Sequence, residues 1–412
     1  MSSIERPKLR NVSAFPVQVS GRQMIYIQDP LRFSEKPVMV SPDAFFIISL
    51  FDGNHSILDI QEQYMRRYGD LLFSDRVRAI IQELDSNLFL ESDRFEQYKK
   101  LVLEEFSASS VRAAFHADGA YESEPSRLKE QLTAFFTSPE GPGELNREVV
   151  ASSDVKGIVA PHIDLVRGGP CYAWAYKEIG ERCDADLFVI LGTSHSVSKN
   201  MFILTMKDFQ TPFGVMVTDR DFVRSLAEGY SADLFEDELI HKFEHSIEFQ
   251  VVFLQYVLRG KKNAKVVPIL CSSFNEMIEE NVLPSELPAI GDFTSLLKET
   301  AAKSGKSVCF IASADLSHVG KRFGDQVSLS SGLLELIRSR DLEMLERVEQ
   351  LDATGFFRSI QEERDERKIC GLPPIYMLLS VIEASQGKLL KYSRSPDHGT
   401  ESVVSFASLS FS

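Results

Sequence analysis

The chain has 412 residues, of which 43% are hydrophobic and 25% charged, and its formal net charge is −15 at pH 7. These proportions are ordinary for a globular protein, so they exclude wholesale disorder, a collagen-like fold and a disulfide-stapled miniprotein. The acidic balance disfavours nucleic-acid binding, because a negative surface repels phosphate backbones.

The sequence predicts a cytoplasmic protein without a membrane partner. No apolar run approaches the ~18 residues that a membrane span needs, and the segment from Met1 to Arg10 lacks the apolar core of a signal peptide. The cysteines are odd in number and lack C-x-x-C spacing, which favours reduced thiols over disulfides or a zinc knuckle. These cysteines are Cys171, Cys183, Cys271, Cys309 and Cys370.

Residues 1–105 read as a small first domain of strands and helices. Residues 1–100 carry 13 basic and 14 acidic side chains, so almost all of the net charge belongs to the rest of the chain. Helices are predicted to begin near Pro42, Ser56 and Ser74, where capping residues precede apolar residues at helical spacing. Short strands are predicted over 23–27, 37–40 and 88–90, and 106–110 is predicted to be a linker.

This first domain resembles the PqqD-like domains. The resemblance rests on the predicted elements, on residues 50–56, LFDGNHS, and on residues 80–84, IIQEL. It implies a winged-helix-type α+β domain that binds a peptide by adding a strand. A DNA-binding winged helix shares the outline, but the near-neutral charge counts against it. A small packed accessory domain without a ligand is the other alternative.

From residue 150 onward, within an expected second domain of residues 111–412, apolar strands alternate with helices. Continuous apolar runs separated by helices are typical of an α/β domain with a mostly parallel sheet covered by helices on both faces. Two C-terminal runs, 388–392 and 403–411, are predicted to add strands at the edge of the sheet. The central strands are predicted over 157–160, 187–191, 266–270 and 308–312, and the helices over 172–180, 221–226 and 246–258.

Three histidines follow the carboxyl ends of predicted strands. His162, His195 and His318 stand there, and Asp315 precedes the last of them. In open α/β sheets ligands bind at this rim, and neutral imidazole is the commonest metal ligand in proteins. Two imidazoles with an oxygen ligand form the open site typical of non-haem iron. The alternative is that each histidine is a hydrogen-bonded loop residue.

Two other residues near predicted turns have side chains that could take part in catalysis. His245 stands at the start of a helix, where the helix N-terminus disfavours a protonated imidazole, so His245 could act as a neutral base or simply cap the helix. Cys370 precedes a Gly-Leu-Pro-Pro turn, and we interpret its thiol as structural. The sequence contains neither a P-loop nor a G-x-G-x-x-G after a strand, so the usual nucleotide-binding signatures are absent.

Residues 111–412 resemble the Memo family, known in prokaryotes as AmmeMemoRadiSam system protein B. The resemblance rests on ordered motifs, which are residues 115–121, FHADGAY, 160–162, APH, 191–195, LGTSH, 244–248, EHSIE, 313–318, SADLSH, 370–371, CG, and 399–404, GTESVV. It implies a fold similar to that of class III extradiol dioxygenases, which use non-haem iron.

The resemblance also implies roles for individual residues. His162 and His195 match the two metal-binding histidines, and His245 matches the acid/base histidine of the dioxygenases. The third ligand position, a carboxylate in the dioxygenases and a cysteine in animal Memo, falls on Ser317. Serine is a poor ligand for iron or copper, so Asp315, His318 or water would have to complete the site. The expected metal is Fe(II), with Cu or Zn as alternatives and no metal as a further one.

Two functions follow from these observations. The first is a metal-dependent, dioxygenase-like redox enzyme in which His245 transfers protons, with Glu248 nearby on the same helix. The second is a non-catalytic scaffold that binds a ligand or peptide. From the family name, its partners would be a radical SAM enzyme and an AMMECR1-domain protein.

Overall fold

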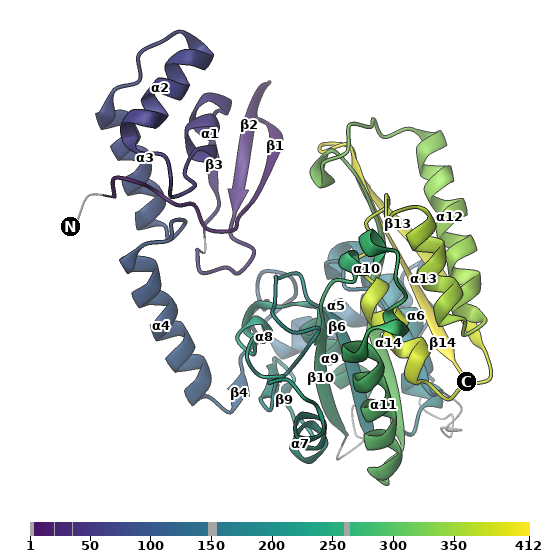
Figure 1. Ribbon diagram of the computed structural model, residues 1–412. Coiled ribbons are helices and arrows are strands. Elements are labelled where there is room, and N and C mark those ends of the chain that lie inside the picture. The colour runs from purple at the N-terminus through teal and green to yellow at the C-terminus, as the bar shows by residue number, and fades with distance from the viewer. Residues whose placement is uncertain (1–3, 20, 35, 147–154, 259–263) are drawn as a thin grey trace. The chain divides into compact units, whose positions relative to one another are not determined.

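The computed structural model describes residues 4–19, 21–34, 36–146, 155–258 and 264–412 (Figure 1). The chain divides into two compact units. Unit 1 comprises Met1–Ala108 with the two short segments Lys321–Val327 and His398–Glu401. Unit 2 comprises Ser109–Gly320, Ser328–Asp397 and Ser402–Ser412.

Unit 1 is an α+β structure built on a three-stranded antiparallel sheet. The strands are β1 (Ser13–Val19), β2 (Arg22–Gln28) and β3 (Val38–Val40), in that order. The helices are α1 (Pro42–Ser49), α2 (Ile57–Tyr68), α3 (Ser74–Ser86) and α4 (Asp93–Ala108). The buried side chains of these elements form a core of their own, which includes Ile27, Ile47, Ile60, Val77 and Leu84.

Two features of unit 1 differ from the sequence expectation. Strand β1 was not predicted; it contains Pro16, which an edge strand tolerates because it needs hydrogen bonds on one side only. The predicted linker over 106–110 begins too early, because α4 continues to Ala108. Its buried residues Phe95, Val102 and Phe106 recur at helical spacing.

Unit 2 is an α/β structure around an eight-stranded mixed sheet, which confirms the predicted fold class. The strand order is β12-β14-β5-β11-β6-β10-β7, and β13 pairs with the outer side of β14. The central strands β5, β11, β6 and β10 are parallel, and the flanking strands are antiparallel to their neighbours. The strands are β5 (Gly157–Ala160), β6 (Leu187–Thr193), β7 (Phe202–Leu204), β10 (Lys265–Cys271), β11 (Val308–Ser313), β12 (Asp315–Gly320), β13 (Gly387–Asp397) and β14 (Ser402–Phe411).

Helices cover both faces of this sheet, as predicted. Successive side chains of β6 point to opposite faces, so Val189 and Phe188 belong to two different apolar cores. Around one core lie α7 (Arg220–Gly229), α10 (Asn275–Glu280), α11 (Pro288–Lys303), α12 (Ser331–Glu349), α13 (Ala353–Glu362) and α14 (Leu372–Val381). Around the other lie α5 (Pro125–Thr137), α6 (Leu165–Arg182) and α9 (Ser246–Val257).

Smaller elements complete unit 2. A second sheet consists of β4 (Val111–Arg112), β8 (Asp208–Thr211) and β9 (Gly214–Met216). The remaining elements are the short helix α8 (Ile240–Phe243) and the 3₁₀ turn η1 (Pro284–Glu286); η2 (Lys321–Phe323) belongs to unit 1. All five cysteines lie within the described residues and are free thiols. Among the described helices, none has the length and apolar character required to cross a membrane.

The sheet differs from the sequence expectation at its C-terminal strands. Strand β14 was predicted at an edge, but it lies inside the sheet, where its first half pairs with β12 and its last residues pair with β5. The sequence pattern placed Asp315 and His318 just beyond the end of a strand, whereas the structure places both in a further strand, β12. This strand follows β11 directly and joins β14 through a register shift between Asp315 and His318.

Gly371 is required where the chain enters α14. Its N–H donates to the carbonyl oxygen of Asp315 at 3.0 Å. A Cβ atom at this position would lie 2.4 Å from that oxygen and 2.6 Å from the Cβ of Ala314. Only glycine therefore lets the segment before α14 pack against the junction of β11 and β12.

We predict that Gly371→Ala destabilises the protein by about 1–3 kcal/mol, because the segment before α14 must move away from β12. Gly291→Ala in α11 is the matched control. The nearest atom to its new Cβ is 3.7 Å away, so the alanine should stabilise the helix by up to about 1 kcal/mol. Urea unfolding of both variants tests this, and equal stability of Gly371→Ala and the wild type would contradict it.

Candidate metal centre

Three histidines from different elements meet at the carboxyl ends of the central strands. His162 follows β5, His195 follows β6, and His245 precedes the first turn of α9. One ring nitrogen from each can be chosen so that all three atoms lie within 4.8 Å of one another. The ring centroids are 5.0 Å apart for His162 and His195 and 4.9 Å apart for His195 and His245. This spacing fits a single metal ion bound by three imidazoles.

The strand register brings these residues together. Ala160 of β5 pairs with Ser313 of β11, and Thr193 of β6 pairs with Cys271 of β10, so these strands end at one level. Gly192 then allows α9 to approach β6. A Cβ there would lie 2.6 Å from the side chain of Ile247, so glycine is needed to place His245 beside the strand ends.

Each of the three histidines has its Nδ1 atom at an acceptor. Nδ1 of His162 lies 3.1 Å from the carbonyl oxygen of Ser313. Nδ1 of His195 and Nδ1 of His245 each lie 3.1 Å from the carboxylate of Glu244. Because these acceptors bind an N–H group, we infer that Nδ1 carries the proton and that Nε2 presents its lone pair. Such partners orient metal-binding histidines in known sites.

Glu244 is the acceptor that joins two of the imidazoles. Its buried carboxylate also accepts the backbone N–H groups of His195 at 3.0 Å, His245 at 2.8 Å and Ser246 at 3.0 Å. Burial opposes ionisation of this carboxyl, but His195 and His245 outweigh burial and hold its pKa well below its usual range. Burial lowers the pKa of His195, but the Glu244 carboxylate raises it by more, so the pKa of His195 lies above its usual value.

His162 is in a different electrostatic environment. Its side chain is buried, and burial, followed by the charges of His195 and His245, holds its pKa well below the usual histidine value. His162 is therefore neutral at pH 7, which is the form that binds a metal.

Cys370 adds a sulfur atom to this cluster. Its Sγ atom lies 3.2 Å from Nε2 of His162, and its carbonyl oxygen accepts the hydroxyl of Thr193 at 3.3 Å. Burial, and secondarily Asp315, raises the pKa of the thiol well above its usual value. A bound metal would lower that pKa, because thiols bind metals as thiolates. The donor set of imidazoles and one sulfur suits iron, copper or zinc.

Asp315 and His318 adjoin the cluster. Asp315 accepts the N–H of His162 at 2.9 Å, and its other carboxylate oxygen lies 3.7 Å from Nε2 of His162. Burial raises the pKa of Asp315. Nδ1 of His318 lies 3.0 Å from the carbonyl oxygen of Leu316, and burial lowers the pKa of His318 to about 4.

The remaining predicted site residues bind other partners. The Ser317 hydroxyl donates to Asp341 at 2.6 Å within a buried network. The Glu248 carboxylate is ion-paired with Arg112, and it accepts the hydroxyl of Tyr121 and the N–H of His116. Burial raises the pKa of Glu248, but Arg112 and its other partners together lower it by more, so the pKa of Glu248 lies below its usual value.

Arg112 connects Glu248 to the histidine segment. Its guanidinium donates to the carbonyl oxygens of His241 and Glu244, each at 2.9 Å. The ion pair of Arg112 and Glu248 therefore holds the chain just before His245 against the start of α9.

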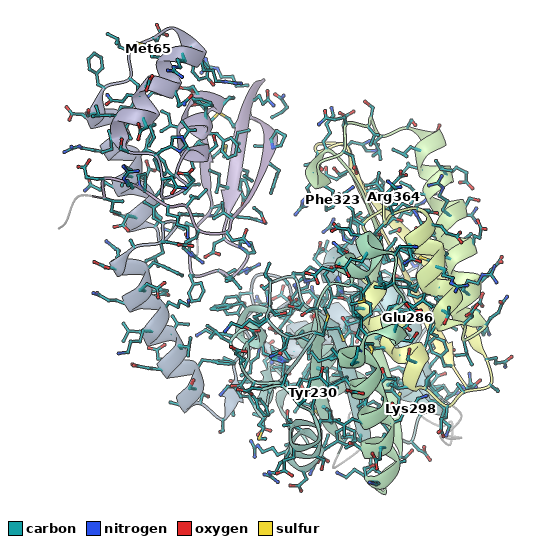
Figure 2. The ribbon with its side chains drawn as sticks, viewed as in Figure 1. Met65, Tyr230, Glu286, Lys298, Phe323 and Arg364 are labelled. Carbon is teal, nitrogen blue, oxygen red and sulfur yellow. The ribbon has the colours of Figure 1, made fainter. Side chains whose placement is uncertain are left out.

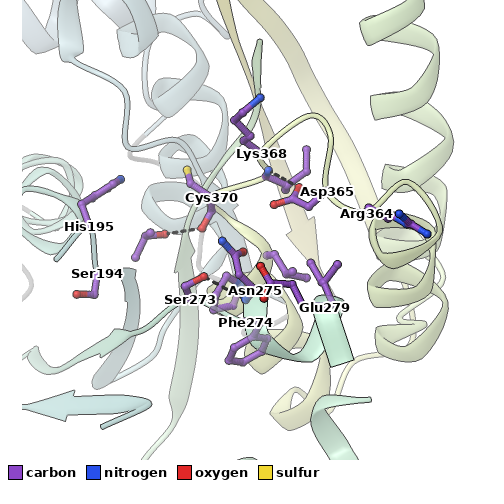
Figure 3. A pocket seen from close by; sticks show the side chains of 15 residues that line it. Ser194, His195, Ser273, Phe274, Asn275, Glu279, Arg364, Asp365, Lys368 and Cys370 are labelled. Atoms are coloured by element: carbon purple, nitrogen blue, oxygen red, sulfur yellow. Dashed lines mark hydrogen bonds between the residues drawn. The ribbon is translucent and has the colours of Figure 1, made fainter. Parts of the chain in front are cut away.

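A cavity of about 390 Å³ opens beside the cluster (Figure 3). His195 and Cys370 line it, so a molecule bound there would contact two residues of the candidate metal centre. Its apolar lining includes Phe274, Ile278, Leu372 and Pro373, and its charged lining includes Glu279, Arg364, Asp365 and Lys368.

Sequence reasoning missed two members of this site. It assigned Cys370 a structural role, and it assigned Glu244 no role although this residue begins the EHSIE motif. The adjacency of Glu244 to His245 was an available signal for a histidine partner. Cys370 had a weaker signal, because it stands 208 residues from His162 and only the fold brings their side chains together.

We predict that Glu244→Gln weakens Zn(II) binding about 10-fold or more, because an amide lacks the charge that orients His195 and His245. Glu248→Gln, in the first turn of α9, is the matched control. It breaks the pair with Arg112, so it should lower the free energy of unfolding and affect Zn(II) affinity less. Competition titration with a chelator measures both affinities, and an equal loss in the two variants would contradict this role of Glu244.

Comparison with known proteins identifies the family. The family model for Memo-like proteins matches residues 112–410. A MEMO1 family protein of Aquifex aeolicus is 30% identical over 98% of this chain and all of its own length. A MEMO1 family protein of Methanosarcina barkeri is 28% identical over 70% of this chain and 95% of its own. A MEMO1 family protein of Thermococcus kodakarensis is 31% identical over 61% of this chain and 85% of its own length. The chain therefore belongs to the Memo family.

Proposed function

We propose that this chain is a metal-dependent redox enzyme, similar to the non-haem-iron dioxygenases, that acts on a small molecule bound beside His195 and Cys370. The observation that carries the proposal is the common orientation of three imidazoles. His162, His195 and His245 each have Nδ1 at an acceptor and Nε2 available for a metal. The sulfur of Cys370 supplies a fourth donor.

Fe(II) is the metal that we propose, with copper and zinc as the competing outcomes. Imidazole suits all three, and a thiolate adds affinity for iron, Cu(I) and zinc. When bound, a redox-active ion supplies Lewis acidity and one-electron chemistry that the side chains lack.

The neighbouring residues would bind the substrate and handle protons. His318 is neutral at pH 7 because its pKa is about 4, so it can accept a proton only when a reaction generates a strong acid nearby. Asp315, whose pKa is raised by burial, is the second candidate for proton transfer. The apolar wall of Phe274, Leu372 and Pro373 would exclude water from the bound molecule.

Glu248 and His245 take different roles in this proposal from those that the sequence suggested. His245 shares Glu244 with His195, which favours a role as metal ligand over one as proton shuttle. Glu248 would support the site through Arg112.

We predict that anaerobically purified protein contains or takes up one iron, and that His162→Ala and His195→Ala each abolish tight binding. His55→Ala is the control, because His55 is in unit 1 and pairs with Asp52. Elemental analysis followed by titration with Fe(II), Cu(II), Zn(II) and Mn(II) measures the outcome. A wild-type protein that neither contains nor binds any of these metals would contradict the proposal.

A second candidate function is a scaffold, and exposed apolar side chains in unit 1 favour it. Leu58, Leu71 and Phe73 are 75%, 73% and 71% exposed, and Met65 is also exposed (Figure 2). Burying exposed apolar side chains such as these against a partner is favourable, because it removes apolar surface from water. The occupant that we propose is a peptide segment of a partner, namely a radical SAM enzyme or an AMMECR1-domain protein.

For this candidate we predict that the double variant Leu71→Ser and Phe73→Ser weakens capture of these two purified partners by at least about tenfold, the equivalent of ~1.4 kcal/mol. Leu336→Ser is the control, because Leu336 is half-exposed on α12 of unit 2. Biolayer interferometry with the full chain gives the affinities. Equal binding by the double variant and the control would count against the scaffold.

A further inference from the structure

Another buried ionic cluster in unit 2 surrounds Asp341 of α12. The Asp341 side chain is fully buried and is ion-paired with Arg367. Its carboxylate also accepts the hydroxyls of Ser317 at 2.6 Å, Tyr392 at 2.8 Å and Ser405 at 2.5 Å. The cluster therefore joins α12, β12, β13 and β14 to the segment that contains Arg367, and none of these side chains belongs to the histidine cluster.

Arg367 stands in the irregular segment between α13 and α14, which ends at Cys370. Three residues of this segment, Arg364, Asp365 and Lys368, have φ angles of 53°, 49° and 52°. Residues other than glycine rarely adopt this left-handed conformation, so contacts outside the segment must stabilise it. Arg367 supplies such contacts. Its guanidinium binds Asp341 and donates to Glu363 at 2.8 Å, and its carbonyl oxygen accepts the N–H of His318 at 2.6 Å.

The position of Cys370 follows from these contacts. Arg367 is three residues before Cys370, and Gly371 on the other side is hydrogen-bonded to Asp315. Between these two attachments the thiol lies 3.2 Å from Nε2 of His162. If the segment relaxed at Arg367, the left-handed residues would be free to adopt other conformations, and the sulfur would leave the imidazoles.

We propose that the ion pair of Asp341 and Arg367 is a positioning pair, which holds the Cys370 sulfur within bonding reach of the metal bound by the histidines. This inference rests on the proposed metal centre, and it assigns a role to residues that do not touch the metal. An apolar pair could fill the same volume without the desolvation cost of two buried charges. The planar guanidinium of Arg367, however, donates to Asp341 through Nη1 and to Glu363 through Nε, and these two bonds together restrict the segment to one orientation.

Unit 1 offers a matched comparison. Arg10 and Asp29 form another buried pair, with nitrogen–oxygen distances of 2.8 and 3.2 Å. That pair has the same residue types and a similar burial, but it is in the other unit from the histidine cluster. Arg→Lys at each position keeps the charge and removes the planar guanidinium.

The test compares Arg367→Lys with Arg10→Lys in the full chain loaded with Co(II). The thiolate-to-Co(II) charge-transfer absorption reports the sulfur–metal bond, and chelator competition gives the Co(II) affinity. We expect Arg367→Lys to bind Co(II) about 10-fold more weakly and to lose most of this absorption, and we expect the same loss of absorption in Cys370→Ala. Arg10→Lys should keep both at wild-type level, although its urea midpoint also falls.

Several results would overturn the inference. Arg367→Lys with wild-type affinity and absorption would do so, as would an equal loss of both in Arg10→Lys. If Arg367→Lys does not fold, Asp341→Asn provides the same comparison, since it removes the charge without changing the side-chain size. Wild-type protein that takes up no Co(II) would contradict the proposed metal centre itself. If the wild type takes up Co(II), and Arg367→Lys and Asp341→Asn have the same affinity and absorption as the wild type, only the positioning role is contradicted.

Discussion

The histidine cluster depends on one buried anion, the carboxylate of Glu244. It binds the Nδ1 atoms of two imidazoles and the backbone N–H groups at the end of β6 and the start of α9. A strand end and a helix start are thereby held at one point, which neither element could achieve by apolar packing alone. His195 and His245 cannot turn independently, because both rings share the same acceptor.

Burying that charge is costly, and the surrounding structure explains why the cost is tolerated. An isolated carboxylate in the interior would take up a proton. Glu244 remains ionised because every hydrogen bond that it accepts comes from an N–H group and because the N-terminus of α9 is partially positive. A second buried pair, Arg112 and Glu248, binds the backbone of the same segment, so the approach of α9 is fixed twice.

The sequence was informative for those elements and residues whose place in the fold follows from a local pattern of apolar residues. Apolar runs predicted the four central strands, and parallel strands must end at one rim, so the residues alone were enough to place His162 and His195 there. The same pattern cannot report contacts made across the sheet. The Cys370 thiol is brought to His162 by a segment without periodicity, and the Ser317 hydroxyl is directed to Asp341 by pairing of β12 with β14. A charged residue such as Glu244 is ordinarily exposed, so its burial was not foreseeable.

The donors of the centre are held in two different ways, and this has a chemical consequence. The imidazoles of His162 and His195 follow strand ends, that of His245 directly precedes α9, and all three are bound by near neighbours, so their geometry is a property of the sheet itself. The sulfur depends on a segment with left-handed residues whose contacts lie on α12 and β12. Changes in those distant contacts would move the sulfur while leaving the three imidazoles in place. If the centre binds a metal as we propose, the Cys370 sulfur, rather than the histidines, would be the donor through which this fold could adjust metal preference and redox potential.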